Sequence, residues 1–316
     1  MTNLTSLTNL TIEMISVIIC SINKTLATQV QQSIAETIGV EWELILLDNN
    51  ELKKSITAVY NLGASRASYS ILCFVHEDVL FKTNNWGQLV TGYFSSDSSL
   101  GAVGIAGSKY KSKTPSGWSA GIPELDCCNI LHVSANGTEL QLYSNPEPEK
   151  KMQQVVTLDG VFICTTKEAW KKTPFNEELL RGFHLYDIDF SYAVSASYTV
   201  CVTYEIDLVH LTEGGSFGDQ WLNYTLLWHS VNKEKLPRYV GAAKTNFSYY
   251  ERIVRKGWLN RLSSEKISLR NKTRWLLKAQ VYKDVMVWPY AAKLLLYRYI
   301  KPVIQLFKKR ANFILP

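Results

Sequence analysis

The chain has 316 residues, of which 46% are hydrophobic, and a formal net charge of +6. This composition is typical of a globular protein with a large core and excludes disordered and fibrous classes. No apolar run reaches the roughly 18 residues that span a bilayer, and residues 1–13 lack the basic and apolar blocks of a secretory signal. We therefore expect residues 1–13 to be a flexible leader. The six cysteines form no CxxC pair and most lie in apolar runs, which predicts a reduced, cytoplasmic protein.

Charge is distributed unevenly along the chain. Residues 252–310 hold 16 lysines and arginines against two acidic residues, whereas the rest of the chain holds 18 against 26. A basic tail on an acidic body predicts a negatively charged partner for the tail. That partner could be an anionic lipid, a nucleic acid or a phosphorylated substrate.

Strands and helices alternate from the first apolar run onward. Continuous β-branched and apolar runs predict buried strands, and apolar residues at helical spacing predict helices. In chain order the predicted elements are strand 15–20, helix 25–38, strand 42–48, helix 52–67 and strand 70–75. This alternation predicts an α/β fold with a doubly wound, mostly parallel, Rossmann-like sheet.

The later part of the chain is less regular. We expect helices at 84–95 and within 183–194, strands at 102–107, 157–165 and 198–211, and loops with short strands over 108–155. The region 108–155 is interpreted as a specificity region. Beyond about residue 220 the pattern is helical, aromatic and basic, which predicts a helical C-terminal extension.

Each of the first three strands ends in polar residues, at 21–23, 48–50 and 76–78. Ligands bind at the carboxyl ends of the strands in open parallel sheets, so these side chains are expected at one ligand-binding edge. The chain has no G-x-G-x-x-G after its first strand and no G-x-x-x-x-G-K-[ST]. A nicotinamide-binding domain and a P-loop nucleotidase are therefore disfavoured.

Two groups of residues could carry chemistry. The His-Glu-Asp run at 76–78 could ligate a divalent cation, since carboxylates suit Mg²⁺ or Mn²⁺ and imidazole suits Mn²⁺. His210, at the end of a later strand, could complete such a site. Asp187 and Asp189 lie at a predicted helix start, where a carboxylate can be a simple cap or, beside a metal site, a general base.

Seven short motifs occur in a set order over roughly residues 14–220. They are SVIICSIN (16–23), ILLDNNE (45–51), NLGASRA (61–67), FVHEDV (74–79), LDGVFI (158–163), LYDIDFS (185–191) and VHLTEGG (209–215). Their order resembles that of the inverting nucleotide-sugar glycosyltransferases of family 2, which have a GT-A fold. The H-x-D form of FVHEDV is most similar to the subgroup typified by a streptomycin-biosynthesis glycosyltransferase-like domain.

The resemblance implies a role for the residues in each motif. Asp78 and His210 would bind Mn²⁺ or Mg²⁺, with His76 as a third candidate ligand. Asp187 would be the catalytic base, with Asp189 as the alternative. The nucleotide-sugar donor, for which the family favours UDP, would be contacted by Ser21, Asn23, Asp48, Asn61, Arg66, His76, Glu77, Asp159 and Gly160.

The chain departs from the family pattern in three places. His76 stands where the first Asp of D-x-D is usual, and Tyr186 stands where a Glu usually precedes the base. The Q-x-x-R-W motif of many members is absent, and the sequence Asp-Gln-Trp at 219–221 resembles it only in part. That absence, together with the lack of an apolar span, argues against a processive polysaccharide synthase.

The segment 288–310 combines aromatic, aliphatic and basic residues. A basic amphipathic helix of this kind fits an anchor on the anionic inner face of the cell membrane, but it also fits a helix packed on the catalytic domain with a solvated basic face. No nucleic-acid-binding motif accompanies it, so nucleic acid is not expected as a partner.

These observations predict a leader (1–13), a GT-A nucleotide-sugar glycosyltransferase domain (14–220) and a basic, aromatic helical region (221–316). The leading hypothesis is a metal-dependent, inverting glycosyltransferase that acts on a glycan or lipid-linked saccharide in surface polysaccharide or glycoconjugate assembly. A non-catalytic nucleotide-sugar or glycan-binding module of the same fold is the alternative. A metal-dependent hydrolase is a third hypothesis, disfavoured because no H-E-x-x-H or similar ligand run occurs.

Overall fold

The computed structural model describes residues 14–211, 217–241 and 246–296, so the predicted leader lies outside it. Its centre is a seven-stranded sheet in the order β10-β13-β5-β12-β3-β1-β2. The strands are β1 (Ile15–Ser21), β2 (Trp42–Asp48), β3 (Ile71–Val75), β5 (Leu100–Gly104), β10 (Met152–Gln154), β12 (Phe162–Thr166) and β13 (Thr199–Thr203). Strands β12 and β10 run against the shared direction of the other five. The predicted mostly parallel α/β sheet is confirmed, with one reversed strand in its middle.

Helices cover both faces of this sheet, as a doubly wound fold requires. Helices α1 (Lys24–Thr37) and α4 (Trp86–Ser96) pack on one face, and α3 (Ile56–Arg66) and α6 (Tyr186–Val194) pack on the other. Strand β1 shows why its sequence is apolar throughout. Val17 and Ile19 join the core beneath α1, while Ile18, which points the other way, joins the core beneath α3.

A second sheet of six strands lies against the first. It contains β4 (Val79–Phe81), β6 (Ala106–Ser108), β8 (Asp126–Val133), β9 (Glu139–Ser144), β11 (Thr157–Leu158) and β14 (Leu208–Leu211). The expectation of loops and short strands over 108–155 was wrong for β8, which is eight residues long. Strand β9 was hard to predict because its alternation of polar and apolar residues is short, limited to 139–142, and its side chains are largely exposed.

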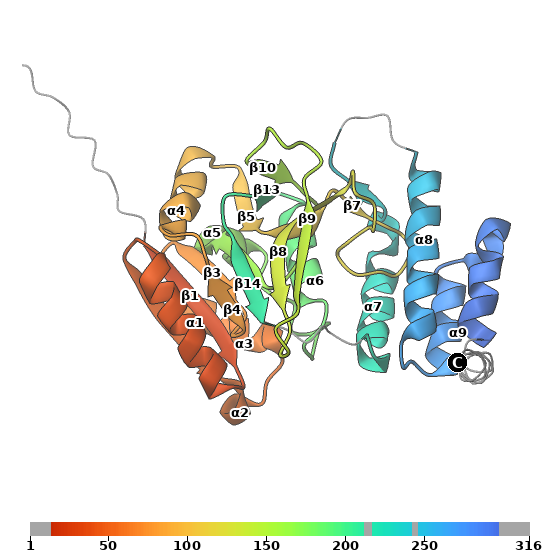
Figure 1. The fold of residues 1–316 in the computed structure, drawn as a ribbon, viewed down its shortest axis with the longest axis horizontal. Helices are drawn as coiled ribbons and strands as arrows, with labels where there is room; N and C mark the ends of the chain where they lie inside the picture. Colours follow the sequence, from red (N-terminus) through yellow and green to blue (C-terminus); the bar gives the residue numbers. More distant parts are fainter. Residues whose placement is uncertain (1–13, 212–216, 242–245, 297–316) are drawn as a thin grey trace, which may run out of the picture.

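The C-terminal helices share one core with part of the preceding chain. Helices α7 (Asp219–Asn232), α8 (Phe247–Ser264) and α9 (Leu269–Lys278) lie together at the end of the molecule away from α1 (Figure 1). Their core includes side chains of α6 and of the segment 110–125. The remaining elements are α2 (Asn49–Leu52), α5 (Lys167–Lys172), β7 (Tyr110–Lys111) paired with β15 (Arg238–Tyr239), and three short 3-10 helices at Lys233–Lys235, Val281–Lys283 and Val285–Val287.

Of the helices in the described part of the chain, none has both the length and the apolarity to span a bilayer. Most of the predicted membrane-binding segment 288–310 lies outside the described residues. Within its described part, Leu294 is buried in the C-terminal core, whereas Trp288 is 53% exposed.

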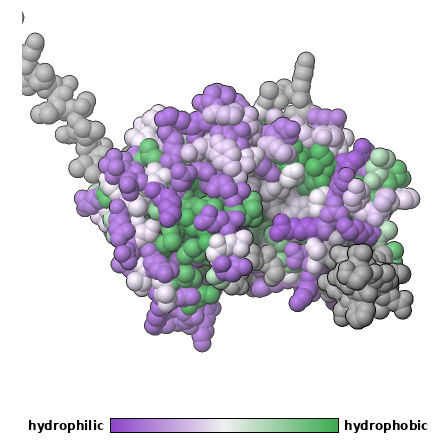
Figure 2. Space-filling model, viewed as in Figure 1, coloured by the Kyte–Doolittle hydropathy of each residue, from purple (hydrophilic) through white to green (hydrophobic). Residues whose placement is uncertain are grey.

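In the space-filling view, apolar residues gather near the centre of one face and hydrophilic residues surround them (Figure 2).

We expect the packing between α3 and the sheet to tolerate no added atoms. A methyl group at Gly63 would overlap the side chain of Ile18, whereas one at Gly92, in α4, would meet nothing within 4 Å. Both Gly→Ala changes remove a helical glycine and so share the same propensity gain. Urea denaturation should therefore show Gly63→Ala to be about 1–3 kcal/mol less stable than Gly92→Ala. Equal stability of the two variants would show that this interface is loosely packed.

Candidate active site

The predicted ligand-binding edge is formed, and Glu77 connects two of its strands. The Glu77 carboxylate accepts hydrogen bonds from the Ser21 hydroxyl (2.6 Å) and from the backbone amides of Ile22 and Asn23. Asn23 in turn caps α1 with its side chain. Asp48 lies in register beside Ser21 at the end of β2, where it caps α2. The ends of β1, β2 and β3 therefore form one rigid polar edge.

Three side chains in contact with this edge form a candidate cation site. Ligand atoms of His76, Asp78 and His210 all lie within 4.8 Å of one another. The Asp78 carboxylate is 3.2 Å from Nε2 of His210 and 3.9 Å from Nδ1 of His76. The antiparallel pairing of β14 with β4 brings His210 beside Asp78. One carboxylate oxygen and two imidazole nitrogens form a donor set that suits Mn²⁺ better than Mg²⁺.

The electrostatics of Asp78 and His76 suit a cation, whereas those of His210 oppose one. Burial alone would raise the pKa of Asp78, but the hydrogen bond from His210 and the two nearby histidines lower it overall. Burial lowers the pKa of His76. Burial would lower the pKa of His210 too, but Asp78 outweighs that effect and raises it. Because a cation binds an ionised carboxylate and neutral imidazoles, it would compete with the proton that Asp78 favours on His210.

Tyr186 orients His76. The Tyr186 hydroxyl donates to the carbonyl of Gly160 (3.1 Å) and lies 2.6 Å from Nε2 of His76. A hydroxyl has one proton, so while Tyr186 donates to Gly160 it accepts from His76 Nε2–H, and in this tautomer Nδ1 is an acceptor on the side of Asp78. Gly160 has no room for a side chain, since a methyl group there would overlap the Tyr186 hydroxyl. The two sequence departures, His76 and Tyr186, are thus partners of one another.

Asp187 and Asp189 both lie in the first turn of α6, but only Asp187 lines the cavity described below. In Asp187, the orientation of the carboxylate is fixed by the backbone. Its Oδ2 accepts a hydrogen bond from the Gly160 amide (3.1 Å). Burial, with the charge of Asp159 added to it, raises the pKa of Asp187 to about 7. Asp189 instead accepts a hydrogen bond from Nε1 of Trp228 (2.7 Å) and thereby ties α6 to α7.

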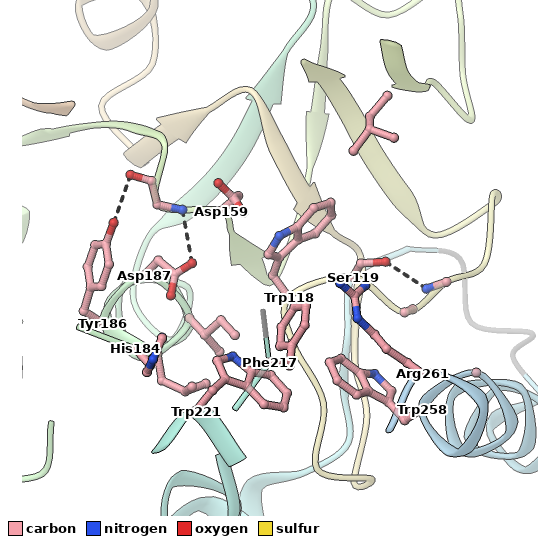
Figure 3. A pocket seen from close by; sticks show the side chains of 18 of the residues that line it. Trp118, Ser119, Asp159, His184, Tyr186, Asp187, Phe217, Trp221, Trp258 and Arg261 are labelled. Atoms are coloured by element: carbon pink, nitrogen blue, oxygen red, sulfur yellow. Dashed lines mark hydrogen bonds between the residues drawn. The ribbon is translucent and has the colours of Figure 1, made fainter. Parts of the chain in front are cut away.

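His76, His210 and Asp187 line one cavity of about 720 Å³, whereas Asp78 and the strand-end residues Ser21, Asp48 and Glu77 are not part of its lining. Its polar side includes His76, Asp159, Gly160, Tyr186, Asp187 and His210. Its aromatic side comes from residues 117–121 and the C-terminal helical region, and includes Trp118, Phe217, Trp221, Trp258 and Arg261. Figure 3 shows Asp187 and Arg261 on opposite sides, with aromatic rings between them. A cavity of this size and mixed lining is typical of a small-ligand site.

Buried polar groups hold the loop 112–121, which forms one wall of the cavity. Glu251 of α8 accepts hydrogen bonds from Tyr110, Ser112, Lys113 and Thr114. The Lys111 ammonium donates to Ser116 and to the Gly117 carbonyl, and burial lowers its pKa to about 7. Asp126 accepts from Ser119, Ala120 and Gly121. The wall is therefore preorganised rather than a loose loop.

Two residues predicted to contact the nucleotide-sugar are not part of this site. The amide of Asn61 is fully occupied, because it accepts from Trp170 and Phe175 and donates to Phe175 and Glu177. Arg66 ends α3, five residues before β3 begins, so it lies at the opposite edge of the sheet. The structure corrects both assignments: Asn61 anchors the chain between α5 and α6, and Arg66 is a surface residue.

Several residues in the cavity lining or beside the candidate cation site were missed from the sequence. His132 lies in register with His210 across β8 and β14, and their rings are 5.2 Å apart. No local signal marked it, because its strand falls in the region expected to be loops. Trp118 is 140 residues before Trp258 and 143 before Arg261 in the sequence. These residues meet only through tertiary packing. Aromatic richness beyond residue 220 was the one available hint.

Comparison with known proteins identifies the family. The model of a glycosyltransferase-like family matches residues 16–228, about two thirds of the chain. The chain belongs to this glycosyltransferase-like family. This membership, with the observed sheet, confirms the GT-A type of fold and identifies a glycosyltransferase. No curated protein matches the chain.

Solved structures show only distant likenesses. GalNAc-T7 with UDP, GalNAc and Mn²⁺ is 11% identical with a TM-score of 0.49, over 69% of this chain and 48% of that one. Staphylococcus aureus TarS 1–349 is 14% identical with a TM-score of 0.49, over 84% and 78%. The chain thus spans about half the length of the GalNAc-T7 chain. At these values the likenesses carry no argument about residues or substrates.

We expect Asp187→Asn to stabilise the protein in a pH-dependent way. A carboxyl whose pKa is raised from 3.8 to about 7 on folding contributes stability at low pH that is lost as pH rises through 7. The variant should therefore melt at a higher temperature than wild type at pH 8, with the difference vanishing near pH 4. Thermal denaturation between pH 4 and 8 tests this. An unchanged difference across that range would show that Asp187 has an ordinary pKa.

Proposed function

We propose that this glycosyltransferase is metal-dependent and inverting, and that it moves a sugar from a UDP-sugar to a glycan or lipid-linked saccharide in surface polysaccharide or glycoconjugate assembly. One observation carries the proposal. A carboxylate with a raised pKa, Asp187, lines the same cavity as His76 and His210 of the candidate cation site. A base and a cation site on one sugar-sized cavity are the two requirements of such a transfer.

The donor would bind at the polar edge. Asp78, His210 and Nδ1 of His76 would hold Mn²⁺, which when bound supplies positive charge opposite the leaving diphosphate. Ser21 and Asp48 lie on the adjoining edge and would contact the nucleoside. Tyr186 would act through His76, since its hydroxyl keeps the imidazole in the tautomer whose Nδ1 is free.

The acceptor would bind on the side of Asp187. This carboxylate would take the proton from the attacking acceptor hydroxyl, with the Gly160 amide holding its Oδ2 in place. A pKa near 7 makes it a stronger base than an ordinary carboxylate while about half of it is still ionised at neutral pH. A single in-line displacement then inverts the anomeric carbon. Asp189 is not proposed as the base because Trp228 occupies it.

The alternative is a nucleotide-sugar- or glycan-binding module that has lost catalysis. The replacements at His76 and Tyr186 motivated it, but their mutual hydrogen bond favours a changed, intact site over a decayed one. Release of nucleoside diphosphate that depends on an added acceptor distinguishes the two. Kinship with the streptomycin-type subgroup, a cytoplasmic location and attachment of the tail to the membrane stay predictions.

We expect Mn²⁺-dependent binding of one nucleoside diphosphate, UDP, at the His-Asp-His cluster. At a hundredfold excess over its dissociation constant a ligand raises stability by about 2.7 kcal/mol. A thermal-shift panel of nucleoside diphosphates with and without Mn²⁺ should show this shift in wild type and lose it in Asp78→Ala. Tyr186→Phe should weaken Mn²⁺ binding about 10- to 100-fold. Asp97→Ala, an exposed carboxylate elsewhere, is the matched control. No shift with any nucleotide would contradict the proposal.

We expect the two carboxylates of α6 to differ sharply in catalysis. Asp187→Asn should lower turnover about 10²- to 10⁴-fold, because a positioned base contributes that much. Asp189→Asn keeps the oxygen that accepts from Trp228 and should retain most activity. For wild type, kcat/KM should rise with pH to a plateau above about 7, since only ionised Asp187 accepts a proton. Acceptor-dependent UDP release measures each quantity, and similar losses in the two variants would refute the assignment.

A further inference from the structure

The aromatic half of the cavity has no role in donor binding or proton transfer. Trp221 and Trp258 stack with ring centroids 4.8 Å apart, and Phe217 packs edge-on against Trp221 at 4.6 Å. Trp118 belongs to the loop 112–121, which forms another wall of the cavity, and is only partly buried. Flat aromatic surfaces bind the apolar C–H faces of sugar rings, and rigid ones do so at little entropic cost.

One cation is present in this aromatic surface. The Arg261 guanidinium lies 3.9 Å above the Phe217 ring and 5.9 Å from that of Trp258, which hold it in place while its side chain stays half exposed. Its nearest acid among the described residues is Glu265, at 3.9 Å from Nε, too far for a hydrogen bond. Both Nη groups thus lack a hydrogen-bonded carboxylate in the described part of the chain.

The position of Arg261 separates it from the donor chemistry. It lies across the cavity from Asp187, with Trp118, Phe217 and Trp221 between (Figure 3). The acidic residues that line the cavity, Asp159 and Asp187, are both on the far side. An anion would therefore be attracted to the Arg261 end and repelled from the other, which orients a bound molecule along the cavity.

We propose that this aromatic half is an acceptor subsite for an anionic glycan, in which Arg261 pairs with a carboxylate or phosphate of the acceptor while a hydroxyl several atoms away reaches Asp187. This inference rests on the proposed transferase function and adds the acceptor class to it. A planar guanidinium fork matches either group bidentately, so the two sources share one recognition chemistry. The C-terminal helices thereby select the acceptor.

The test is binding to a glycan array on which each anionic glycan stands beside its neutral counterpart. Uronic-acid glycans are paired with carboxyl-reduced forms, and phosphorylated glycans with dephosphorylated forms, so the two arms identify the anion. The proteins are wild type, Arg261→Met, Arg261→Lys and Lys256→Met. Lys256 lies on the same helix and is exposed outside the cavity lining, so its loss controls for net charge. Tryptophan fluorescence gives dissociation constants for the best pair.

Wild type should prefer an anionic glycan over its neutral partner at least tenfold. Arg261→Met should lose that preference without changing affinity for the neutral form, Arg261→Lys should keep part of it, and Lys256→Met should match wild type. Mn²⁺-dependent UDP binding, measured on the same samples, should be equal in all four and reports separately on the donor site. The inference is overturned if wild type binds no anionic glycan preferentially or if Arg261→Met keeps the preference. This holds even if all four proteins bind UDP. Absence of UDP binding in wild type would instead count against the transferase proposal.

Discussion

The site depends on the hydrogen bond between His76 and Tyr186. It joins the end of β3, where the candidate cation ligands begin, to the first turn of α6, which carries Asp187. The same tyrosine hydroxyl donates to Gly160, whose amide holds Asp187. One connected set of hydrogen bonds thus orients the imidazole of His76 and the carboxylate of Asp187 at once. Such networks are rigid only when every member is satisfied, and here the absent side chain of Gly160 is part of that condition.

The C-terminal helices are part of the site and not an appendage to it. Glu251 of α8 accepts hydrogen bonds from Tyr110 and from three residues of the loop 112–121. Trp258 and Arg261 of the same helix line the cavity. A helix that both anchors a wall and supplies its lining couples the C-terminal core to substrate binding. The boundary predicted at residue 220 therefore divides the sequence pattern, while the hydrophobic core runs across it.

The two ends of the cavity carry opposite electrostatic character. At one end, burial raises the pKa of Asp187, and the charge of Asp159 adds to that effect. Arg261 lies at the other end, where aromatic contacts hold it in place and no described acid forms a hydrogen bond with it. Between them lie the aromatic rings of Trp118, Phe217 and Trp221. In the function proposed above, this separation lets one cavity hold the reacting hydroxyl at one end and the anion of the acceptor at the other.

From the sequence we could predict the alternation of strands and helices, the polar edge after the first three strands and the candidate residues His76, Asp78, Asp187 and His210. These signals are local, because buried strands must be apolar and ligand-binding residues follow them directly. The folded chain was needed to show that Asp187 lines the cavity and Asp189 does not, that Asn61 and Arg66 lie away from it, and that His132 lies beside His210. It also assembled the wall that contains Trp118 and Arg261. Those outcomes depend on strand pairing and helix packing between distant residues, which no local pattern encodes.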